Sequence, residues 1–380
     1  MNILLNALSA RRGGGQTYVN KILRNLTDKS IQIYLLAPVS LSLNDCPENV
    51  TKIATSWPTD NPFLRILWET LRLPGLIKKT KADVVFWPGG LISCRIPAGC
   101  KVVTTFQNMM PFSPVQRAEF PLGYMRVRHW LLEKGLLAGM ERSDLVIFLS
   151  NFARDLITRR LGHAPKSSQV ISHGIGIEFK EEETIPRIAL LPDGEYFLYV
   201  SDFYEYKNQI EVVRAYAQLK QKRSTAEKLL LVGYAQTDYG KKVRAEILRL
   251  GMEDDIIITG FRPYEELPAI NHYAKIVIFA SECENCPNIL LEAMGQGKPL
   301  IVADHQPMPE FGGDAVIYFN PTSPADLADK IRDIVDRPDR LQELGQKTRT
   351  RSRQYHWQIT ARKTWAAIKE IGQTGSAKHT

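Results

Sequence analysis

SECENCPNILLEAMG (residues 281–295) follows the strand-like run IVIFA (residues 276–280) and decides how this part of the chain folds. Asn288 is a good helix N-cap residue, so a strand, a polar loop with Glu284 and a helix carrying Glu292 follow one another. This order points backbone N–H groups at an anion. Glu292, about one turn into the helix, can face neutral hydroxyls beside that anion, which suits a nucleotide sugar. The alternative is a surface loop capped by Asn288 with two solvated glutamates.

Short β-rich runs alternate with longer helical patterns along the chain, which predicts an α/β protein with parallel strands and crossover helices. The 380 residues suffice for two domains, and each of the two sets of strands suffices for one doubly wound sheet. Glycines, prolines and the stretch Glu181–Glu183 break the periodicity between Gly174 and Pro192, so we expect the domain boundary there. Strands are expected at residues 3–5, 31–36, 83–86, 101–104, 144–149 and 170–171, and then at 196–200, 228–232, 256–259, 274–280 and 300–303.

The net charge of +8 and the pI of about 9.1 favour anionic partners such as nucleotide diphosphates, anionic lipids or nucleic acid. No nucleic-acid-binding motif occurs, so we do not expect nucleic acid as a partner. No apolar run approaches the roughly 18 residues that span a bilayer. Residues 1–10 are short, have no basic residue ahead of them and read as a first strand rather than a signal peptide. These features predict a cytoplasmic protein.

The five cysteines are an odd number in a chain without a secretion signal, which argues against a disulfide scaffold. Cys283 and Cys286 form a C-x-x-C near a helix start, where a redox role is the alternative. A lone C-x-x-C supplies only half of a four-thiolate zinc site. We expect both cysteines to be packing residues, and we expect no metal site.

A glycine run and several charged residues follow other predicted strands, so we expect them at the carboxyl edges of the two sheets. Gly13-Gly14-Gly15, preceded by Arg11 and Arg12, follows the first strand and allows close approach of a ligand. Lys207 follows the strand at 196–200 and can place an ammonium group on a phosphate oxygen. Arg262 and Glu310 also follow strands. The plainer alternatives are a tight turn, a solvated helix-start lysine and ordinary loop residues, but ligands of open α/β sheets bind at this edge.

Two stretches mix aromatic, apolar and basic residues: residues 57–79 and residues 112–134, which include Phe120. This mixture suits helices that lie on an anionic membrane surface. The alternative is a pair of amphipathic helices that pack on their own sheet.

Together these residues resemble the GT-B glycosyltransferases of the large retaining family 4, most strongly from Tyr196 to Pro321. The resemblance is weaker but visible at Gly13–Gly15, at 105–112, at Ser150 and at 173–175. It implies two Rossmann-like doubly wound domains that face a central cleft. The implied parts are an acceptor-binding domain (1–175), a donor-binding domain (190–355) and a C-terminal segment (356–380) whose helix returns to the N-terminal domain.

The resemblance also implies an activity. A retaining enzyme of this family would move a mannose-, glucose- or galactose-type hexose from a GDP- or UDP-sugar to a saccharide acceptor, with no further cofactor and no metal. We expect a lipid-linked acceptor in bacterial surface polysaccharide or lipopolysaccharide synthesis. The protein would be cytoplasmic, with a peripheral position on the inner face of the membrane as a further expectation.

The family's glutamate–seven–glutamate motif matches Glu284, implied to contact the donor sugar, and Glu292, implied to contact the ribose. Lys207 matches the family lysine that binds the diphosphate, and Lys207 and Glu284 are the implied catalytic residues. The other implied donor-binding residues are Gly14, Gly15, Arg262, Asn285, Asn288, Ile289, Leu290 and Glu310. The implied acceptor-side residues are Gln107, Asn108 and His173.

Three departures from the family pattern stand out. Asp202 occupies the usual arginine position, and a carboxylate cannot hold a diphosphate, so Arg262, Arg11 or Arg12 would have to supply the second cation. Pro287 has no N–H to donate in the loop that should hold the leaving group. The acceptor-side histidine position is Gln107 or Asn108, neither of which is a base; in a retaining reaction the leaving diphosphate can take the acceptor proton.

Two rival functions remain at this level. Asp202 and Pro287 support a catalytically inactive GT-B subunit that binds a nucleotide sugar or a partner enzyme. The doubly wound pattern also fits a nicotinamide-dependent oxidoreductase, but the chain lacks a complete G-x-G-x-x-G followed by an acidic residue about 20 positions later.

Overall fold

The computed structural model describes residues 1–11, 13–38, 40–41, 46–55, 57–119, 123–179 and 185–376. These residues form two compact units: unit 1 contains Met1–His173 and the C-terminal residues from Trp357 onward, and unit 2 contains Gly174–His356. Residues 174 and 175, which the sequence places in the first domain, belong to unit 2. Arg12, Phe120 and Glu181–Glu183 lie outside the described residues.

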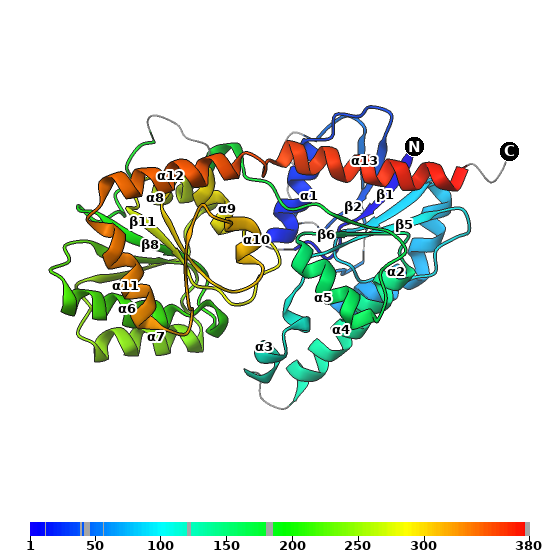
Figure 1. Cartoon of the computed structure of the whole chain (residues 1–380). Coiled ribbons are helices and arrows are strands. Elements are labelled where there is room, and N and C mark those ends of the chain that lie inside the picture. The colour runs from blue at the N-terminus through cyan, green and yellow to red at the C-terminus, as the bar shows by residue number, and fades with distance from the viewer. Residues whose placement is uncertain are drawn as a thin grey trace. The chain divides into compact units, whose positions relative to one another are not determined.

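Unit 1 is an α/β unit whose strands and helices alternate (Figure 1). Its strands are β1 (Asn2–Asn6), β2 (Gln32–Leu36), β3 (Val50–Ile53), β4 (Val84–Trp87), β5 (Lys101–Phe106), β6 (Leu145–Phe148) and β7 (Ser168–Val170). Its helices are α1 (Gly14–Arg24), α2 (Pro62–Lys79), η1 (Met110–Phe112), α3 (Pro114–Glu119), α4 (Tyr124–Arg142), α5 (Asn151–Leu161) and α13 (Trp357–Ser376).

The sheet of unit 1 has the order β3-β2-β1-β4-β5-β6-β7, and all its pairs are parallel. Ile3 of β1 lies opposite Ile33 of β2 and Val84 of β4. The central strands are apolar on both sides because helices cover both faces of a parallel sheet. Helix α5 shows how local signals set the ends of these helices: the Ser150 side chain accepts a hydrogen bond from the Ala153 N–H, and Gly162 ends the helix in the left-handed conformation.

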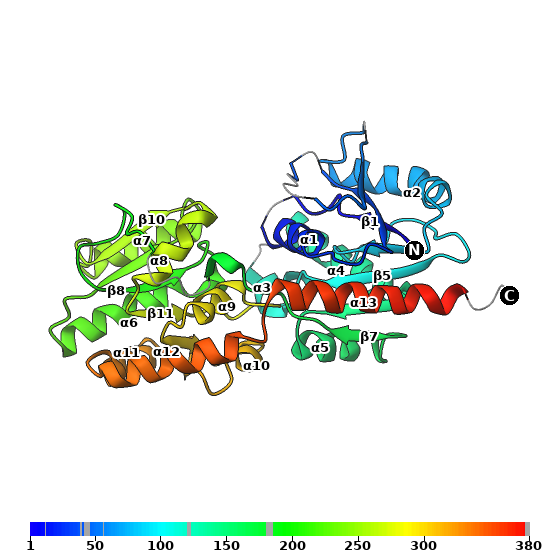
Figure 2. The ribbon, with the colours of Figure 1, turned by 90° about the horizontal axis from the view of Figure 1, so that it is seen from above.

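The C-terminal helix α13 packs on unit 1, on the face of the sheet that α1 also covers (Figures 1 and 2). The indole N–H of Trp365 donates to the carbonyl of Ile22 at 2.9 Å, and its ring meets Phe86 edge to face. Helix α2 covers the opposite face with Trp68 and Leu73. The predicted return of the C-terminal helix to the N-terminal domain is confirmed.

Unit 2 repeats the α/β plan with a smaller sheet (Figure 1). Its strands are β8 (Tyr196–Val200), β9 (Lys228–Val232), β10 (Ile256–Gly260), β11 (Ile276–Phe279), β12 (Leu300–Ala303) and β13 (Ile317–Phe319). Its helices are η2 (Ile177–Phe179), η3 (Glu205–Lys207), α6 (Gln209–Lys222), α7 (Asp238–Arg249), η4 (Tyr264–Glu266), α8 (Leu267–His272), α9 (Asn288–Gly295), α10 (Met308–Gly312), α11 (Pro324–Val335) and α12 (Pro338–Ser352). The sheet order is β10-β9-β8-β11-β12-β13, and all pairs are parallel.

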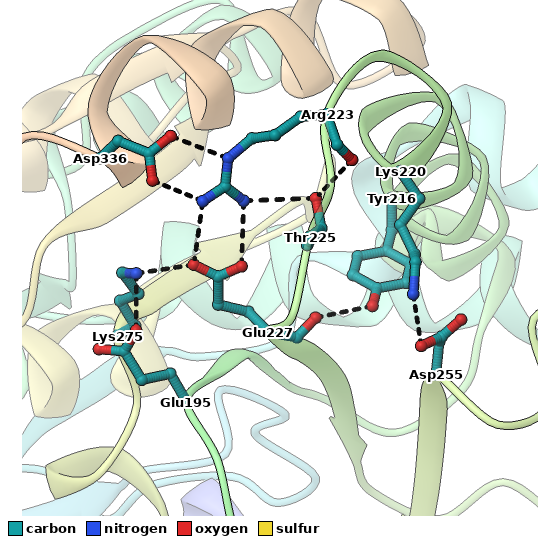
Figure 3. A network of polar contacts seen from close by, with 9 residues as sticks. All are labelled: Glu195, Tyr216, Lys220, Arg223, Thr225, Glu227, Asp255, Lys275 and Asp336. Atoms are coloured by element: carbon teal, nitrogen blue, oxygen red, sulfur yellow. Dashed lines mark hydrogen bonds and ion pairs between the residues drawn. The ribbon is translucent and has the colours of Figure 1, made fainter.

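An ion-pair network ties together the amino ends of four neighbouring strands of unit 2 (Figure 3). Glu227, just before β9, is 4% exposed; it pairs with Lys275, just before β11, at 2.7 Å, and with Arg223, at the end of α6, at 3.0 Å. Burial disfavours the charged form of Glu227, but the hydrogen bonds from Arg223 and Lys275 outweigh it and lower the Glu227 pKa to about 2. Lys275 also reaches Glu195 before β8, and Lys220 reaches Asp255 before β10. The network lies at the opposite strand ends from the loops described next.

Candidate functional site

Lys207 and Glu284 come together at the carboxyl edge of the sheet of unit 2. Lys207 follows β8 and Glu284 follows β11, and these two strands are neighbours. The Lys207 Nζ donates to the Glu284 Oε1 at 2.5 Å, and each side chain is only 15% exposed. The structure therefore joins the two implied catalytic residues in one partly buried ion pair.

Hydrogen bonds between the two loops hold this pair in place. Asn208 has the left-handed conformation (φ 56°, ψ 33°), and its side-chain amide donates to the Ala280 carbonyl at 3.0 Å and to Glu282 at 2.7 Å. The Glu282 N–H donates to the Tyr206 carbonyl at 2.8 Å, and the Tyr199 hydroxyl donates to the Lys207 carbonyl at 2.5 Å. Sequence reasoning missed Asn208; its signal was an asparagine, which tolerates the left-handed conformation, directly after the lysine.

Helix α9 begins just beyond Glu284, but the Asn288 cap predicted from the sequence is wrong. Asn288 is the first helical residue, Pro287 occupies the cap position, and no side chain caps the helix. Proline fits the cap position because it needs no N–H there. The N–H groups of Ile289 and Leu290 lie in the first turn, where a helix supplies no acceptor for them. Asn285, which is buried, precedes this turn.

Glu292 lies in the second turn of α9 and is 7% exposed. Its Oε1 accepts a hydrogen bond of 2.8 Å from the hydroxyl of Tyr264, which follows β10 in η4. Burial and then the carboxylates of Glu292 and Glu178 raise the pKa of Tyr264, so the phenol stays protonated and donates. Tyr264 was not predicted from the sequence, since a tyrosine in a loop carries no signal for such a role.

Arg262 and Glu310 lie after β10 and β12, on the same edge of the sheet. The Arg262 guanidinium donates to Glu266 at 2.7 and 2.5 Å, so in this structure its charge is shared with that carboxylate. Glu310 lies in α10, and its carbonyl accepts from Arg351 at 2.9 Å. Neither arrangement tests the predicted contact with a donor.

Unit 1 places the glycine loop beside Gln107 at the carboxyl ends of β1 and β5. Helix α1 begins at Gly14, and Gly13 has φ 61° and ψ −145°, a conformation reserved for glycine. A Cβ atom at Gly15 would lie 4.0 Å from the Gln107 Oε1. Asn108 is exposed, and its side chain accepts from the Met110 N–H at 3.2 Å.

His173 and Arg11 in unit 1 are held by neighbouring groups. The His173 ring is 4% exposed and lies between Tyr18 and Trp357, with both ring centroids at 5.3 Å. This stack gives His173 a packing role, and its place on the acceptor side stays a prediction. Arg11 donates to the Thr59 carbonyl and lies 3.9 Å from Asp60.

Comparison with protein families covers both units. The model "Glycosyltransferase Family 4" matches residues 12–179, and the model "Glycosyl transferases group 1" matches residues 180–351. The chain belongs to the group 1 glycosyltransferases of family 4. The resemblance to the glycosyltransferases of family 4 is thereby confirmed.

Curated relatives of this glycosyltransferase match over part of their length. The chain is 31% identical to the capsular polysaccharide biosynthesis glycosyltransferase CapH of Staphylococcus aureus over 159 residues, 40% of each chain. It is 25% identical to the O-antigen chain mannosyltransferase B of Escherichia coli over 228 residues, 58% of each chain. The matches thus span between two fifths and three fifths of these relatives.

Solved structures show that the glycosyltransferase has the GT-B fold, as predicted. Sucrose-phosphate synthase from Thermosynechococcus elongatus superposes with a TM-score of 0.77 over 98% of this chain and 100% of that chain, at 17% identity. Anabaena HepE, solved in complex with UDP and glucose, gives a TM-score of 0.71 over 97% of this chain and 100% of that chain, also at 17% identity. At such identities the likeness concerns the fold alone.

Asp202 has a structural role in this glycosyltransferase. It occupies the position to which the family resemblance assigns an arginine. Its carboxylate accepts from the Tyr234 N–H at 2.8 Å, and its carbonyl accepts from Gln209 at 3.0 Å. Asp202 therefore links the loops after β8 and β9 and supplies no cation to a donor.

Within the described part of the glycosyltransferase, no group of three or more His, Cys, Asp or Glu side chains is arranged to hold a metal ion. None of its described helices is long and apolar enough to cross a membrane. Cys286 is buried and Cys283 half-buried, and neither forms a disulfide.

Proposed function

We propose that this glycosyltransferase moves a hexose from a nucleotide-diphosphate sugar to a saccharide acceptor with retention of anomeric configuration. The Lys207–Glu284 pair at the start of α9 carries the proposal. Glu284 precedes α9 by four residues, and the first-turn N–H groups of a helix favour an anion. A diphosphate on the cationic and amide groups leaves Glu284 to accept hydrogen bonds from sugar hydroxyls.

In the proposed reaction, the bond between the anomeric carbon and the diphosphate oxygen breaks as the acceptor oxygen bonds to that carbon. The acceptor proton passes to the departing diphosphate, so no side-chain base is needed. Lys207 and the N–H groups of Ile289 and Leu290 stabilise the charge that develops on the leaving group, and fixed donors of this kind commonly contribute the largest share of catalysis. Glu284 orients the sugar ring for attack.

The donor base and the acceptor are finer parts of the proposal. HepE, of the same fold, was solved with UDP and glucose, and one relative is an O-antigen mannosyltransferase, so UDP- and GDP-hexoses are the donors to test. The named relatives act in capsule and O-antigen synthesis, which supports a surface polysaccharide as the acceptor. That this acceptor is lipid-linked is part of the proposal.

Unit 1 supports a peripheral position on an anionic membrane. Helix α2 packs Trp68 on its sheet but exposes Phe63, Leu67 and Leu71, four residues apart and thus on one face. Helix α4 exposes Trp130 and three more large apolar side chains: Tyr124, Val127 and Leu131. Packing on the sheet therefore accounts for one side of α2, and the exposed side beside basic residues suits a cytoplasmic membrane face.

The proposal is tested by incubating the purified protein with UDP- and GDP-hexoses and saccharide acceptors, with the product anomer read by NMR. We expect transfer from one donor class with the donor's anomeric configuration kept. An inverted product would contradict retention. Donor binding without transfer to a broad acceptor panel would support the inactive-subunit alternative.

A further inference from the structure

The hydroxyl of Tyr264 in unit 2 donates a hydrogen bond to a buried carboxylate. Its acceptor is the Glu292 Oε1 at 2.8 Å. Burial and the charges of Glu292 and Glu178 raise the pKa of Tyr264, so the phenol keeps its single proton for this bond. Glu292 is the glutamate that the family resemblance assigns to the ribose, whereas neither Tyr264 nor Glu178 has a role in that resemblance.

The chain builds this arrangement with two glycines. A Cβ atom at Gly176 would lie 2.3–2.4 Å from the carboxyl atoms of Glu178, so Glu178 folds back into space that only glycine leaves open. A Cβ atom at Gly295 would lie 2.9 Å from the Phe179 carbonyl, so α9 and the 177–179 turn approach closely. The Phe179 ring packs edge to face on Tyr264 with centroids 5.4 Å apart. The phenol is thus fixed by packing as well as by hydrogen bonds.

The physical consequence concerns Glu292, a carboxylate that is 7% exposed. A buried carboxylate needs donors, and the Tyr264 hydrogen bond fixes the rotation of its carboxyl plane. Each carboxylate offers about four lone-pair sites, so a fixed Glu292 can still accept hydrogen bonds from a neutral diol. The ribose of a nucleotide has such a diol.

We propose that Tyr264 is a positioning residue that orients Glu292 to accept the ribose hydroxyls of the donor nucleotide. The inference rests on the proposed donor site. It predicts a specific property, which is preference for a nucleotide with a 2′-hydroxyl over its 2′-deoxy form. A hydrogen-bonding site rejects an analogue that lacks the hydroxyl because its own polar group is then left unpaired.

The test measures the affinity of the full chain for UDP, GDP, 2′-deoxy-UDP and 2′-deoxy-GDP by calorimetry. We expect the wild type to bind its preferred ribonucleotide on the order of tenfold more tightly than the deoxy form. Tyr264→Phe keeps the ring that packs on Phe179 but removes the donor. We expect its ribonucleotide affinity to fall roughly three- to tenfold, with the deoxynucleotide affinity nearly unchanged, so that the preference narrows.

Glu178→Gln and Gly176→Ala change the Glu178 carboxylate, one by removing its charge and the other by displacing it. Both keep the hydrogen bond from Tyr264 to Glu292. We therefore expect each variant to retain the ribose preference of the wild type. Matched controls are Gly194→Ala, where an added Cβ meets nothing within 4 Å, and Tyr216→Phe, whose buried hydroxyl bonds the Glu227 carbonyl at the other end of the sheet.

The outcomes separate this inference from the proposed function. A wild type that binds neither UDP nor GDP overturns the donor site itself. A wild type that binds one of them without preferring ribose overturns the role of Tyr264 and leaves the donor site standing. If Tyr264→Phe loses the same affinity for the ribonucleotide and for the deoxynucleotide, Tyr264 has a merely structural role. That result also overturns its positioning role.

Discussion

The charges of Lys207 and Glu284 satisfy each other in the structure, although the proposed reaction uses them separately. The Lys207 Nζ and the Glu284 Oε1 lie 2.5 Å apart, and each side chain is 15% exposed. Removal of one partner therefore leaves the other with an unpaired and poorly hydrated charge. A donor would supply a diphosphate for the lysine and hydroxyls for the glutamate. The two charges of the pair therefore cancel each other before a donor binds.

A double-mutant cycle measures this coupling. We expect Lys207→Met and Glu284→Gln each to lower the free energy of unfolding, and the double variant to lose less than the sum of the two by about 1–3 kcal/mol. Urea denaturation gives the four values. Strict additivity would show that the two charges do not depend on each other.

The same variants separate stability from catalysis. We expect Lys207→Met to lower kcat/KM by roughly 10²- to 10³-fold at a temperature where it stays folded, as for loss of one fixed donor to a developing anion. Lys228→Met is the control, because Lys228 lies at the amino end of β9 and donates to the Asp254 carbonyl. Full activity in Lys207→Met would remove this residue from the reaction.

A substitution of Pro287 measures how much the backbone N–H that proline lacks at the start of α9 affects donor binding. Because Pro287 occupies the cap position, the first-turn N–H groups of Ile289 and Leu290 are retained. We expect Pro287→Ala to change the donor KM by less than about threefold and to lower stability by about 0.4–1 kcal/mol, as the unfolded chain gains freedom. Steady-state kinetics and urea denaturation check both values. A gain in donor affinity of tenfold or more would show that the proline weakens the site.

The amino ends of the strands of unit 2 have a separate, structural role. The folded-state pKa of Glu227 is about 2, below its ordinary value of 4.5. A depressed carboxyl pKa gives stability that is present above the unfolded pKa and is lost as the pH falls through the folded pKa. We therefore expect Glu227→Gln to be less stable than the wild type at pH 7, with a difference that shrinks between pH 4.5 and pH 2. Urea midpoints at pH 7, 4 and 3 measure it, and a constant difference would contradict the role of the charge.

The sequence located the central strands well but missed two of the edge strands. Strands β8, β9 and β12 have the predicted bounds because they are apolar and buried on both faces. Edge strands β3 and β13 were not predicted: β3 has no fully buried residue, and β13 has one. Short, half-exposed strands leave too little apolar pattern to be read.

The candidate site was likewise predicted only in part. Lys207 and Glu284 were placed on one edge because parallel strands end there together. The hydrogen bonds of Asn208 and Tyr264 could not be foreseen, since they depend on loop conformations that tertiary contacts select. The cap role given to Asn288 failed because Pro287, with its fixed φ, occupies that position instead.

At the scale of the whole molecule, the exposed apolar side of α2 predicts membrane binding. We expect the protein to float with liposomes that contain anionic lipid at low salt and to be released at about 0.5 M salt, where charges are screened. The double variant Phe63→Ser/Leu67→Ser should float less. Leu248→Ser, which removes an exposed leucine from unit 2, is the control. Absence of flotation at low salt would reject the membrane surface.

Lys207, Glu284 and the start of α9 are proposed to form a nucleotide-sugar site. The most direct measurement is the thermal midpoint of the wild type, Lys207→Met and Tyr216→Phe with UDP, GDP and their hexose conjugates. A ligand at about 100 times its Kd stabilises the folded state by about 2.7 kcal/mol. We predict that one nucleotide class raises the midpoint of the wild type and Tyr216→Phe by about 5 °C or more, and that Lys207→Met loses most of this shift. No shift with any of these ligands, or the same shift in Lys207→Met, would contradict the account.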